Sequence, residues 1–160
     1  MGAKALSERD NWQMGARQTG DYGENTFSKL LALHLPENYE VYLKPDKLQL
    51  YTGGKGIILD SLVVNRDTGK CLFIEKKTGN NGGNAHERVY KFLSQGLRSV
   101  VREKYNTCEN PFFLVFSGDT FQRTKYQDEI FLLLEGENYA IMDHDYGNIE
   151  EVARQITEIV

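Results

Sequence analysis

Apolar side chains recur along this chain with two spacings, one typical of helices and one typical of strands. Helix spacing predicts three helices: one that ends before Pro36, one over residues 85–105, and one that Asn148 caps. Strand-like runs predict six strands, over residues 39–43, 57–64, 71–76, 112–116, 130–134 and 139–142. This order of elements implies an α/β fold in which a mixed β-sheet is flanked by α-helices.

The length and composition are those of a soluble domain. A chain of 160 residues can bury a sizeable core without disulfides, so residues 1–160 are expected to form a single domain. No run approaches the ~18 apolar residues of a membrane span, and the N-terminus lacks the apolar core of a signal peptide. Cys71 and Cys108 stand apart from any metal-binding cluster. These features predict a reduced, cytoplasmic protein.

Charge is distributed unevenly along the chain, although the net charge is only −4. Residues 44–104 carry 12 basic and 6 acidic residues, whereas residues 105–160 carry 3 basic and 11 acidic residues. An excess of positive charge creates a local field that attracts a phosphate backbone. The middle of the chain is therefore a candidate surface for nucleic acid, or else a solvated basic face.

Two of the predicted strands are expected to form a hairpin that brings two carboxylates together. A loop over residues 66–69 would pair Asn65 with Lys70. The same register places Asp60 opposite Glu75. Opposed side chains lie about 5 Å apart, where like charges are destabilising. The neighbours of both acids on this face are apolar, so the pair interrupts a surface that otherwise has the pattern of a buried one.

A repelling pair of this kind needs a shared proton, a cation or a shift of register. Lys77 lies two residues beyond Glu75 and therefore on the same face. Mg²⁺ would be a stronger remedy, because it takes oxygen ligands from one or two carboxylates, and the backbone carbonyl of Lys76 could add another. The pattern predicts a metal site at Asp60, Glu75 and Lys76, or else a surface salt-bridge network.

A short polar segment, Asn84-Ala85-His86-Glu87-Arg88, opens the second predicted helix. Asn84 can cap the helix, and Glu87 can return a capping-box hydrogen bond. That interpretation leaves Arg88 unexplained, because a basic residue in the first turn opposes the helix dipole. A helix N-terminus that points at DNA can use Asn and Arg side chains to read base edges. The segment is therefore a plain cap or a DNA-reading tip.

The acidic pair and the polar segment together resemble a known family. Asp60, Glu75 and Lys77 fit the spacing of the catalytic pattern PD-(D/E)xK, with Leu59 where that pattern prefers proline. Residues 83–88 resemble the recognition segment of the EcoRI/MunI group of type II restriction endonucleases, and its MunI version in particular. The likeness extends to residues 6–13, 39–45 and 111–119.

The resemblance implies a restriction-endonuclease-like fold and a type II site-specific deoxyribonuclease that works in a bacterial cytoplasm. Asp60 and Glu75 would bind Mg²⁺ together with the Lys76 carbonyl, and Lys77 would orient or activate the attacking water. The reaction would be hydrolysis of DNA phosphodiester bonds, which leaves 5′-phosphate and 3′-hydroxyl ends.

The resemblance also implies how DNA is read. Asn84, Ala85 and Arg88 match positions that read an inner AATT of double-stranded DNA in this group. His86 and Glu87 would support or join that network. A symmetric homodimer is expected, because two-fold proteins match palindromic sites.

Three alternatives remain open. The chain is apparently shorter than its relatives between Leu43 and Gly56, so it could be the small subunit of a heterodimer that cuts one strand. A repair or junction nuclease of the same fold would keep the metal site without sequence specificity. A DNA-binding module without turnover is disfavoured, because Asp60, Glu75 and Lys77 are all present.

Other polar residues have plainer interpretations. Glu24 suits a helix N-terminus, where the dipole favours a carboxylate. His34 is expected to be a packed or half-exposed core residue, and His144 a solvated loop residue. Five basic residues could touch phosphates or be ordinary surface: Lys55, Lys91, Arg98, Arg102 and Lys104.

Overall fold

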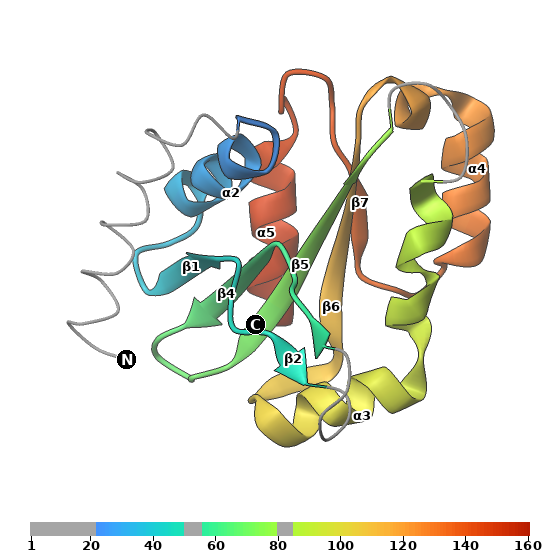
Figure 1. Cartoon of the computed structure of the whole chain (residues 1–160). Coiled ribbons are helices and arrows are strands. Elements are labelled where there is room, and N and C mark those ends of the chain that lie inside the picture. The colour runs from blue at the N-terminus through green and yellow to red at the C-terminus, as the bar shows by residue number, and fades with distance from the viewer. Residues whose placement is uncertain (1–21, 50–55, 80–84) are drawn as a thin grey trace.

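A five-stranded mixed sheet with strand order β1-β4-β5-β6-β7 forms the centre of the molecule (Figure 1). The computed structural model describes residues 22–49, 56–79 and 85–160. The strands are β1 (Tyr39–Leu43), β2 (Leu48–Gln49), β3 (Gly56–Ile57), β4 (Ser61–Asn65), β5 (Cys71–Thr78), β6 (Thr107–Ser117) and β7 (Tyr139–Ile141). The helices are α2 (Tyr22–His34), the 3₁₀ helix η1 (Ala85–Leu93), α3 (Gln95–Lys104), the 3₁₀ helix η2 (Asp119–Gln122), α4 (Thr124–Leu133) and α5 (Ile149–Ile159). The predicted α/β class, with a mixed sheet flanked by helices, is confirmed.

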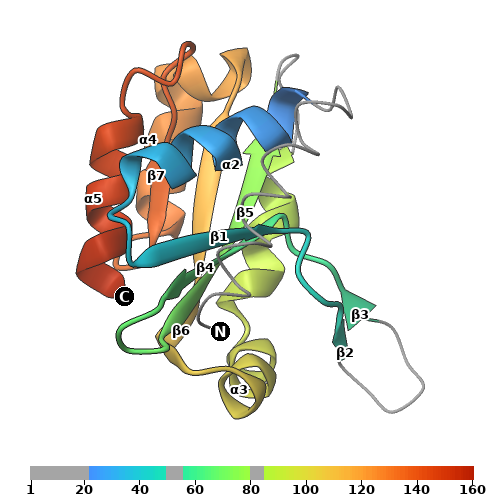
Figure 2. The same ribbon diagram turned by 90° about the vertical axis from the view of Figure 1, so that its left-hand side faces the viewer.

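Strand direction changes at β5, in the middle of the sheet. β1, β4 and β5 are antiparallel neighbours, whereas β5, β6 and β7 run parallel. The β4–β5 hairpin has the predicted register, since Val64 pairs with Cys71 and Ser61 pairs with Ile74. β2 and β3 form a separate two-stranded ribbon that stands apart from the main sheet (Figure 2).

Alternating side chains of the central strands build two apolar layers, one on each face of the sheet. Val63 and Ile74 belong to the layer under α2 and α5, whereas Leu62 and Phe73 belong to the layer under η1, α3 and α4 (Figure 1). Both faces are covered by helices, which is why the central strands are apolar on both sides. None of the helices in the described ranges is long and apolar enough to cross a bilayer.

The strand predicted over residues 130–134 is wrong, because this stretch forms the end of α4 and its C-terminal cap. Ile130 and Leu134 are buried, whereas Phe131 and Leu132 between them are exposed. Burial at every fourth residue is the spacing of one helix face. All five residues of this run are apolar, so the sequence does not show which of them face the core. The apolar content alone therefore favoured a strand.

The helix predicted over residues 85–105 is divided into η1 and α3 at Ser94. Ser94 has an extended backbone (φ −65°, ψ 125°), and its hydroxyl oxygen accepts a hydrogen bond of 3.2 Å from the Leu97 N–H. A serine oxygen in this position caps a new helix. The first half is a 3₁₀ helix, which is wound more tightly than the α-helix that the spacing predicted.

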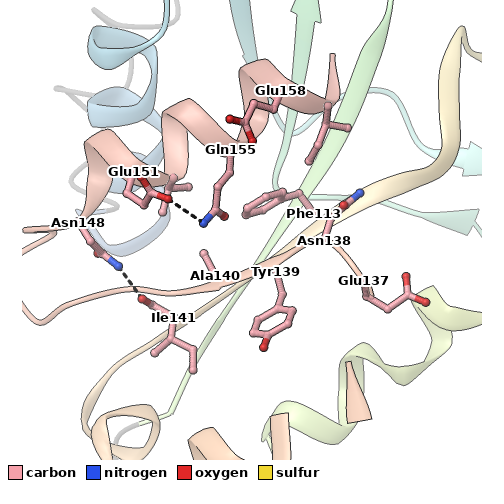
Figure 3. Close-up of a pocket in the computed structure, with 12 residues that line it drawn as sticks. Phe113, Glu137, Asn138, Tyr139, Ala140, Ile141, Asn148, Glu151, Gln155 and Glu158 are labelled. Atoms are coloured by element: carbon pink, nitrogen blue, oxygen red, sulfur yellow. Dashed lines mark hydrogen bonds between the residues drawn. The ribbon is translucent and has the colours of Figure 1, made fainter. Parts of the chain in front are cut away.

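A hollow of about 590 Å³ lies between α5 and the edge strand β7 (Figure 3). Val152 of α5 and Phe113 of β6 line it, and both belong to the apolar layer under α2 and α5. The hollow is therefore on the opposite face of the sheet from Phe73. Its lining does not include Asp60, Glu75 or Lys77, so the hollow does not contain the predicted catalytic residues.

Candidate active site

Asp60 leaves the strand ladder just before β4 begins. The strand that the sequence predicts through this point is interrupted, since β3 ends at Ile57 and β4 starts at Ser61. The Oδ2 atom of Asp60 accepts a hydrogen bond of 2.7 Å from the N–H of Lys76 on β5. The Asp60 carboxylate thereby binds a backbone N–H of β5 that a carbonyl of a neighbouring strand would otherwise bind. Asp60 is held at the end of the hairpin beside Glu75, one step beyond the last regular pair.

Glu75 and Lys77 project from β5 on the same face as Phe73. Glu75 is 8% exposed, and Nζ of Lys77 lies 3.1 Å from its Oε1 atom. The other carboxylate oxygen, Oε2 of Glu75, is buried and has no hydrogen-bond partner among the described residues. A buried carboxylate oxygen without a donor is costly. This atom therefore suits a cation.

Both carboxyl groups have raised pKa values. Burial raises the pKa of Asp60 from its ordinary value of 3.8 to about 6, and the charge of Glu75 adds to the rise. Burial also raises the pKa of Glu75, while the charges of Lys77 and Lys91 oppose that rise. Ionising both acids places two negative charges side by side in a partly buried place. A bound cation would stabilise this doubly ionised form.

The oxygen atoms at this place fit a hard divalent cation. Asp60 and Glu75 offer carboxylate oxygens. The Lys76 carbonyl lies on the Asp60 side of β5, because the N–H and C=O of one strand residue point the same way. Within residues 22–49, 56–79 and 85–160, no three His, Cys, Asp or Glu side chains form a metal cluster. Two carboxylates and a carbonyl are oxygen ligands of the kind that Mg²⁺ binds in proteins, and water molecules fill its remaining coordination positions.

The polar segment that the sequence singles out follows the end of β5. Asn84 and the side chains of Ala85, His86 and Arg88 lie outside the described residues. Glu87 is exposed in the first turn of η1, and η1 contacts both β5 and β6. The helix that carries the segment is thus placed against the strand that carries the acids, while its base-reading role stays a prediction.

Apolar side chains fix η1 on the sheet. Val89 and Phe92 are buried, and the rings of Phe92 and Phe112 of β6 have centroids 4.9 Å apart. A well-packed helix presents its polar residues at a fixed angle. The apolar spacing at Val89 and Phe92 was visible in the sequence, so this anchoring could be predicted.

Gly79 is a residue of this region that the sequence did not reveal. Its N–H donates a 2.9 Å hydrogen bond to the Ser117 carbonyl, and its own carbonyl accepts a 2.8 Å hydrogen bond from Thr120. A Cβ at Gly79 would lie 3.0 Å from Phe121 Cε2 and 3.0 Å from Thr120 Cβ. The chain therefore leaves β5 at a fixed point. A glycine in a Gly- and Asn-rich stretch gives no sequence signal for such a close approach.

The remaining candidates have different outcomes. His34 is exposed, with its ring bonded to the Leu30 carbonyl at 2.8 Å, so the packed or half-exposed core position predicted for it is wrong. His144 is exposed in a loop, as predicted, and its Nδ1 lies 3.4 Å from Oδ1 of Asp119. The Glu24 side chain and Lys55 lie outside the described residues. Cys71 and Cys108 are free thiols, in agreement with their isolation in the sequence.

Arg98 differs most from its sequence interpretation. It was expected to be a surface residue or a phosphate contact, but it is 7% exposed. Its Nη2 lies 2.7 Å from Oε2 of Glu137. Glu137 is 39 residues away in the sequence, so nothing local indicates this pair.

The fold is a mixed sheet in which the β4–β5 hairpin carries two acids, and the helix η1 comes next along the chain. This arrangement defines the class of restriction-endonuclease-like enzymes. The protein family described as type II restriction enzyme MunI matches residues 50–150, which is more than half of the chain. The chain belongs to this family. It is therefore a type II site-specific deoxyribonuclease, as the sequence predicts.

One solved structure shares the fold over nearly its whole length. The crystal structure of MunI restriction endonuclease in complex with cognate DNA matches with a TM-score of 0.68 and 24% sequence identity, over 92% of this chain and 94% of that chain. No curated protein matches the chain closely.

Proposed function

We propose that this enzyme hydrolyses phosphodiester bonds of double-stranded DNA in a Mg²⁺-dependent reaction, at a site formed by Asp60, Glu75 and Lys77. The observation that carries the proposal is the buried Oε2 atom of Glu75, which has no hydrogen-bond partner among the described residues. Glu75 directly precedes Lys76 in the sequence. The N–H of Lys76 donates a hydrogen bond to the Asp60 carboxylate. When bound, the metal would polarise the phosphate and lower the pKa of a water molecule.

The chain's own side chains would prepare this reaction. Asp60 and Glu75, with the Lys76 carbonyl, would hold the metal in place. The side chain of Lys77 is 24% exposed and lies 3.1 Å from Glu75, so its ammonium group can reach from the acid to a phosphate at the surface. Lys77 would orient the attacking water and balance the negative charge of the phosphate. The products would carry 5′-phosphate and 3′-hydroxyl ends.

Sequence recognition would come from residues 84–88, at the start of η1. Asn84, Ala85 and Arg88 would read an inner AATT, with His86 and Glu87 beside them. The solved MunI structure is a complex with cognate DNA, which supports a duplex DNA partner for this chain as well. Residues 44–104, which contain the acids and the segment, also carry the basic excess that would attract the DNA backbone.

The enzyme would act as one endonuclease domain per chain and as a homodimer in the bacterial cytoplasm. A two-fold dimer places two identical sites on a palindromic sequence, one for each strand. A heterodimer with a larger subunit is the alternative that the cleavage pattern would reveal.

A digest of sequenced plasmid DNA tests the proposal. The pure protein is incubated with Mg²⁺ or with a chelator, and every DNA end is mapped. We expect Mg²⁺-dependent double-strand breaks at one motif with an AATT core and 5′-phosphate ends. Asp60→Asn should abolish cleavage, whereas Asp67→Asn, which changes an exposed acid in the hairpin loop, should not.

Other cleavage patterns would contradict particular parts of the proposal. Breaks in one strand only would replace the homodimer by a small subunit of a heterodimer. Random breaks would indicate a nuclease without sequence specificity. Cleavage that survives in Asp60→Asn would overturn the metal site.

A further inference from the structure

Arg98 is a buried arginine that joins the end of η1 to a distant turn. Its Nε atom donates a 2.9 Å hydrogen bond to the carbonyl of Phe92, in the last turn of η1. Its Nη2 atom donates a 2.7 Å hydrogen bond to Oε2 of Glu137, in the turn before β7. A rigid guanidinium that binds two acceptors at once fixes their relative position better than a single hydrogen bond does.

Glu137 is itself held in place by the sheet. The side-chain amide of Asn110 on β6 donates a 2.8 Å hydrogen bond to the same Oε2 atom. Asn110 also accepts a hydrogen bond of 3.1 Å from the N–H of Phe112. Figure 3 shows Glu137 at the end of the hollow that lies away from α5. The support for Arg98 thus comes from β6, the neighbour of the strand that carries Glu75.

Both ends of the segment between β5 and α3 are therefore attached to β6 or to the chain just after it. At the first end, Gly79 is bonded to Ser117 and Thr120. At the second end, Phe92 is bonded to Arg98 and packs on Phe112. The residues proposed to read DNA lie between these two points.

The Arg98 side chain of this ion pair is 9% exposed and that of Glu137 is 25% exposed. An ion pair taken partly out of water gains little net stability, because desolvation of the charges offsets their attraction. An apolar side chain of similar volume at position 98 would not bond the Phe92 carbonyl, which Arg98 binds at 2.9 Å. The geometry therefore assigns the pair a different task. We propose that Arg98 and Glu137 are positioning residues that set the angle of η1, and thereby the strictness with which the enzyme rejects sites that differ by one base pair. This inference rests on the proposed function of residues 84–88.

The test measures discrimination rather than activity alone. The kcat/KM is determined for a duplex with the cognate site and for duplexes with one base pair changed. Arg98→Lys keeps the charge but replaces two nitrogens at a fixed separation by a single nitrogen. Glu137→Gln keeps the shape but removes the charge. A shift of about 1 Å in a supporting element can change a rate about 100-fold. We expect the cognate-to-changed ratio to fall at least about tenfold in both variants.

Arg102→Lys is the matched control. Arg102 lies on the same helix and donates a 2.7 Å hydrogen bond to a backbone carbonyl, that of Glu109, but this residue is outside η1. Its ratio should equal that of the wild type. The double variant of Arg98 and Glu137 should lose no more discrimination than either single variant, because both changes break one network.

An unchanged ratio in both variants would overturn the inference. This holds whether the rates equal those of the wild type or fall by the same factor on every duplex, as mere destabilisation would produce. If Arg98→Lys unfolds at the assay temperature, Glu137→Gln decides the question. A wild-type protein that cuts at no discrete site would instead refute the proposed function, and the inference with it.

Discussion

The carboxylate of Asp60 accepts the backbone N–H of Lys76 at 2.7 Å, in the position that a strand residue would otherwise fill. One acid of the proposed site is thereby tied to the strand that carries the other. The separation of Asp60 and Glu75 is consequently set by the register of the β4–β5 hairpin. A slip of one residue would turn Glu75 to the opposite face and separate the pair.

Replacing Asp60 should stabilise the metal-free protein above pH 6. The folded-state pKa of about 6 lies above the ordinary value of 3.8, so the folded protein binds more protons than the unfolded chain between these values. Stability therefore falls as the pH rises from about 4 to about 6 and stays lowered above that. Asp60→Asn removes this loss. We expect the Tm of Asp60→Asn at pH 8 to exceed that of the wild type. Each kcal/mol gained in the free energy of unfolding raises the Tm of a chain of this size by about 2–4 °C.

Added Mg²⁺ should reverse this order, because the metal stabilises only the protein that retains its ligand. Thermal unfolding at pH 5 and pH 8, with and without Mg²⁺, measures both effects. Asp128→Asn on the exposed side of α4 is the control. A Tm of Asp60→Asn below that of the wild type at pH 8 without metal would contradict the assignment.

Lys77→Met should reduce cleavage by at least about 100-fold without loss of folding. Lys77 lies 3.1 Å from Glu75 and opposes the rise in the pKa of that acid. Without the lysine, Glu75 ionises at higher pH, so any residual activity should need a higher pH and more Mg²⁺. Rates measured against pH and Mg²⁺ concentration test this. Lys70→Met, on an exposed part of the hairpin, should behave as the wild type.

Gly79→Ala should destabilise the protein. The new methyl group would meet Phe121 and Thr120 at 3.0 Å, and overpacking of this kind costs about 1–3 kcal/mol. Gly96→Ala is the control, because a Cβ there would come no closer than 3.7 Å to Ser94 Oγ, and alanine is favoured in a helix by about 0.5–1 kcal/mol. Urea unfolding compares the two. Equal stabilities would show that the Gly79 contact is not tight.

Arg88→Ala should weaken binding to the cognate duplex more than binding to a random duplex. A side chain that reads a base contributes about 1–3 kcal/mol to specific binding, whereas a phosphate contact weakens binding to all sequences alike. Fluorescence anisotropy without Mg²⁺ measures both affinities. Lys125→Ala on α4 removes the same charge elsewhere. A uniform loss on both duplexes would make Arg88 a backbone contact.

The hairpin and the placement of Asp60 beside Glu75 were predictable because their determinants are local. Gly69 has a positive φ of 75°, and the Asn65 N–H bonds the Lys70 carbonyl, so the turn alone fixes which residues pair. The face of each residue then follows from alternation. The break at Asp60 was not predictable, because a carboxylate that bonds to the backbone has no pattern in the sequence.

The errors have equally physical causes. The apolar run at the end of α4 contains exposed leucines, so the run has no visible period. At Ser94 the sequence continues an amphipathic pattern through a change of helix type, since a 3₁₀ helix and an α-helix bury similar positions over one or two turns. The burial of Arg98 depends on Glu137, and a pair formed by tertiary packing has no sequence signal.

The central position of β5 in the sheet also bears on the order in which the enzyme folds. β5 pairs with β4 across a short turn, but it pairs with β6 only after η1 and α3 have been added between them. Short connections close early in folding and long ones close late. A nascent chain would therefore bring its two acids together before η1 has a sheet to rest on. In a cell whose own chromosome is a potential substrate, cutting would begin only once the whole architecture is complete.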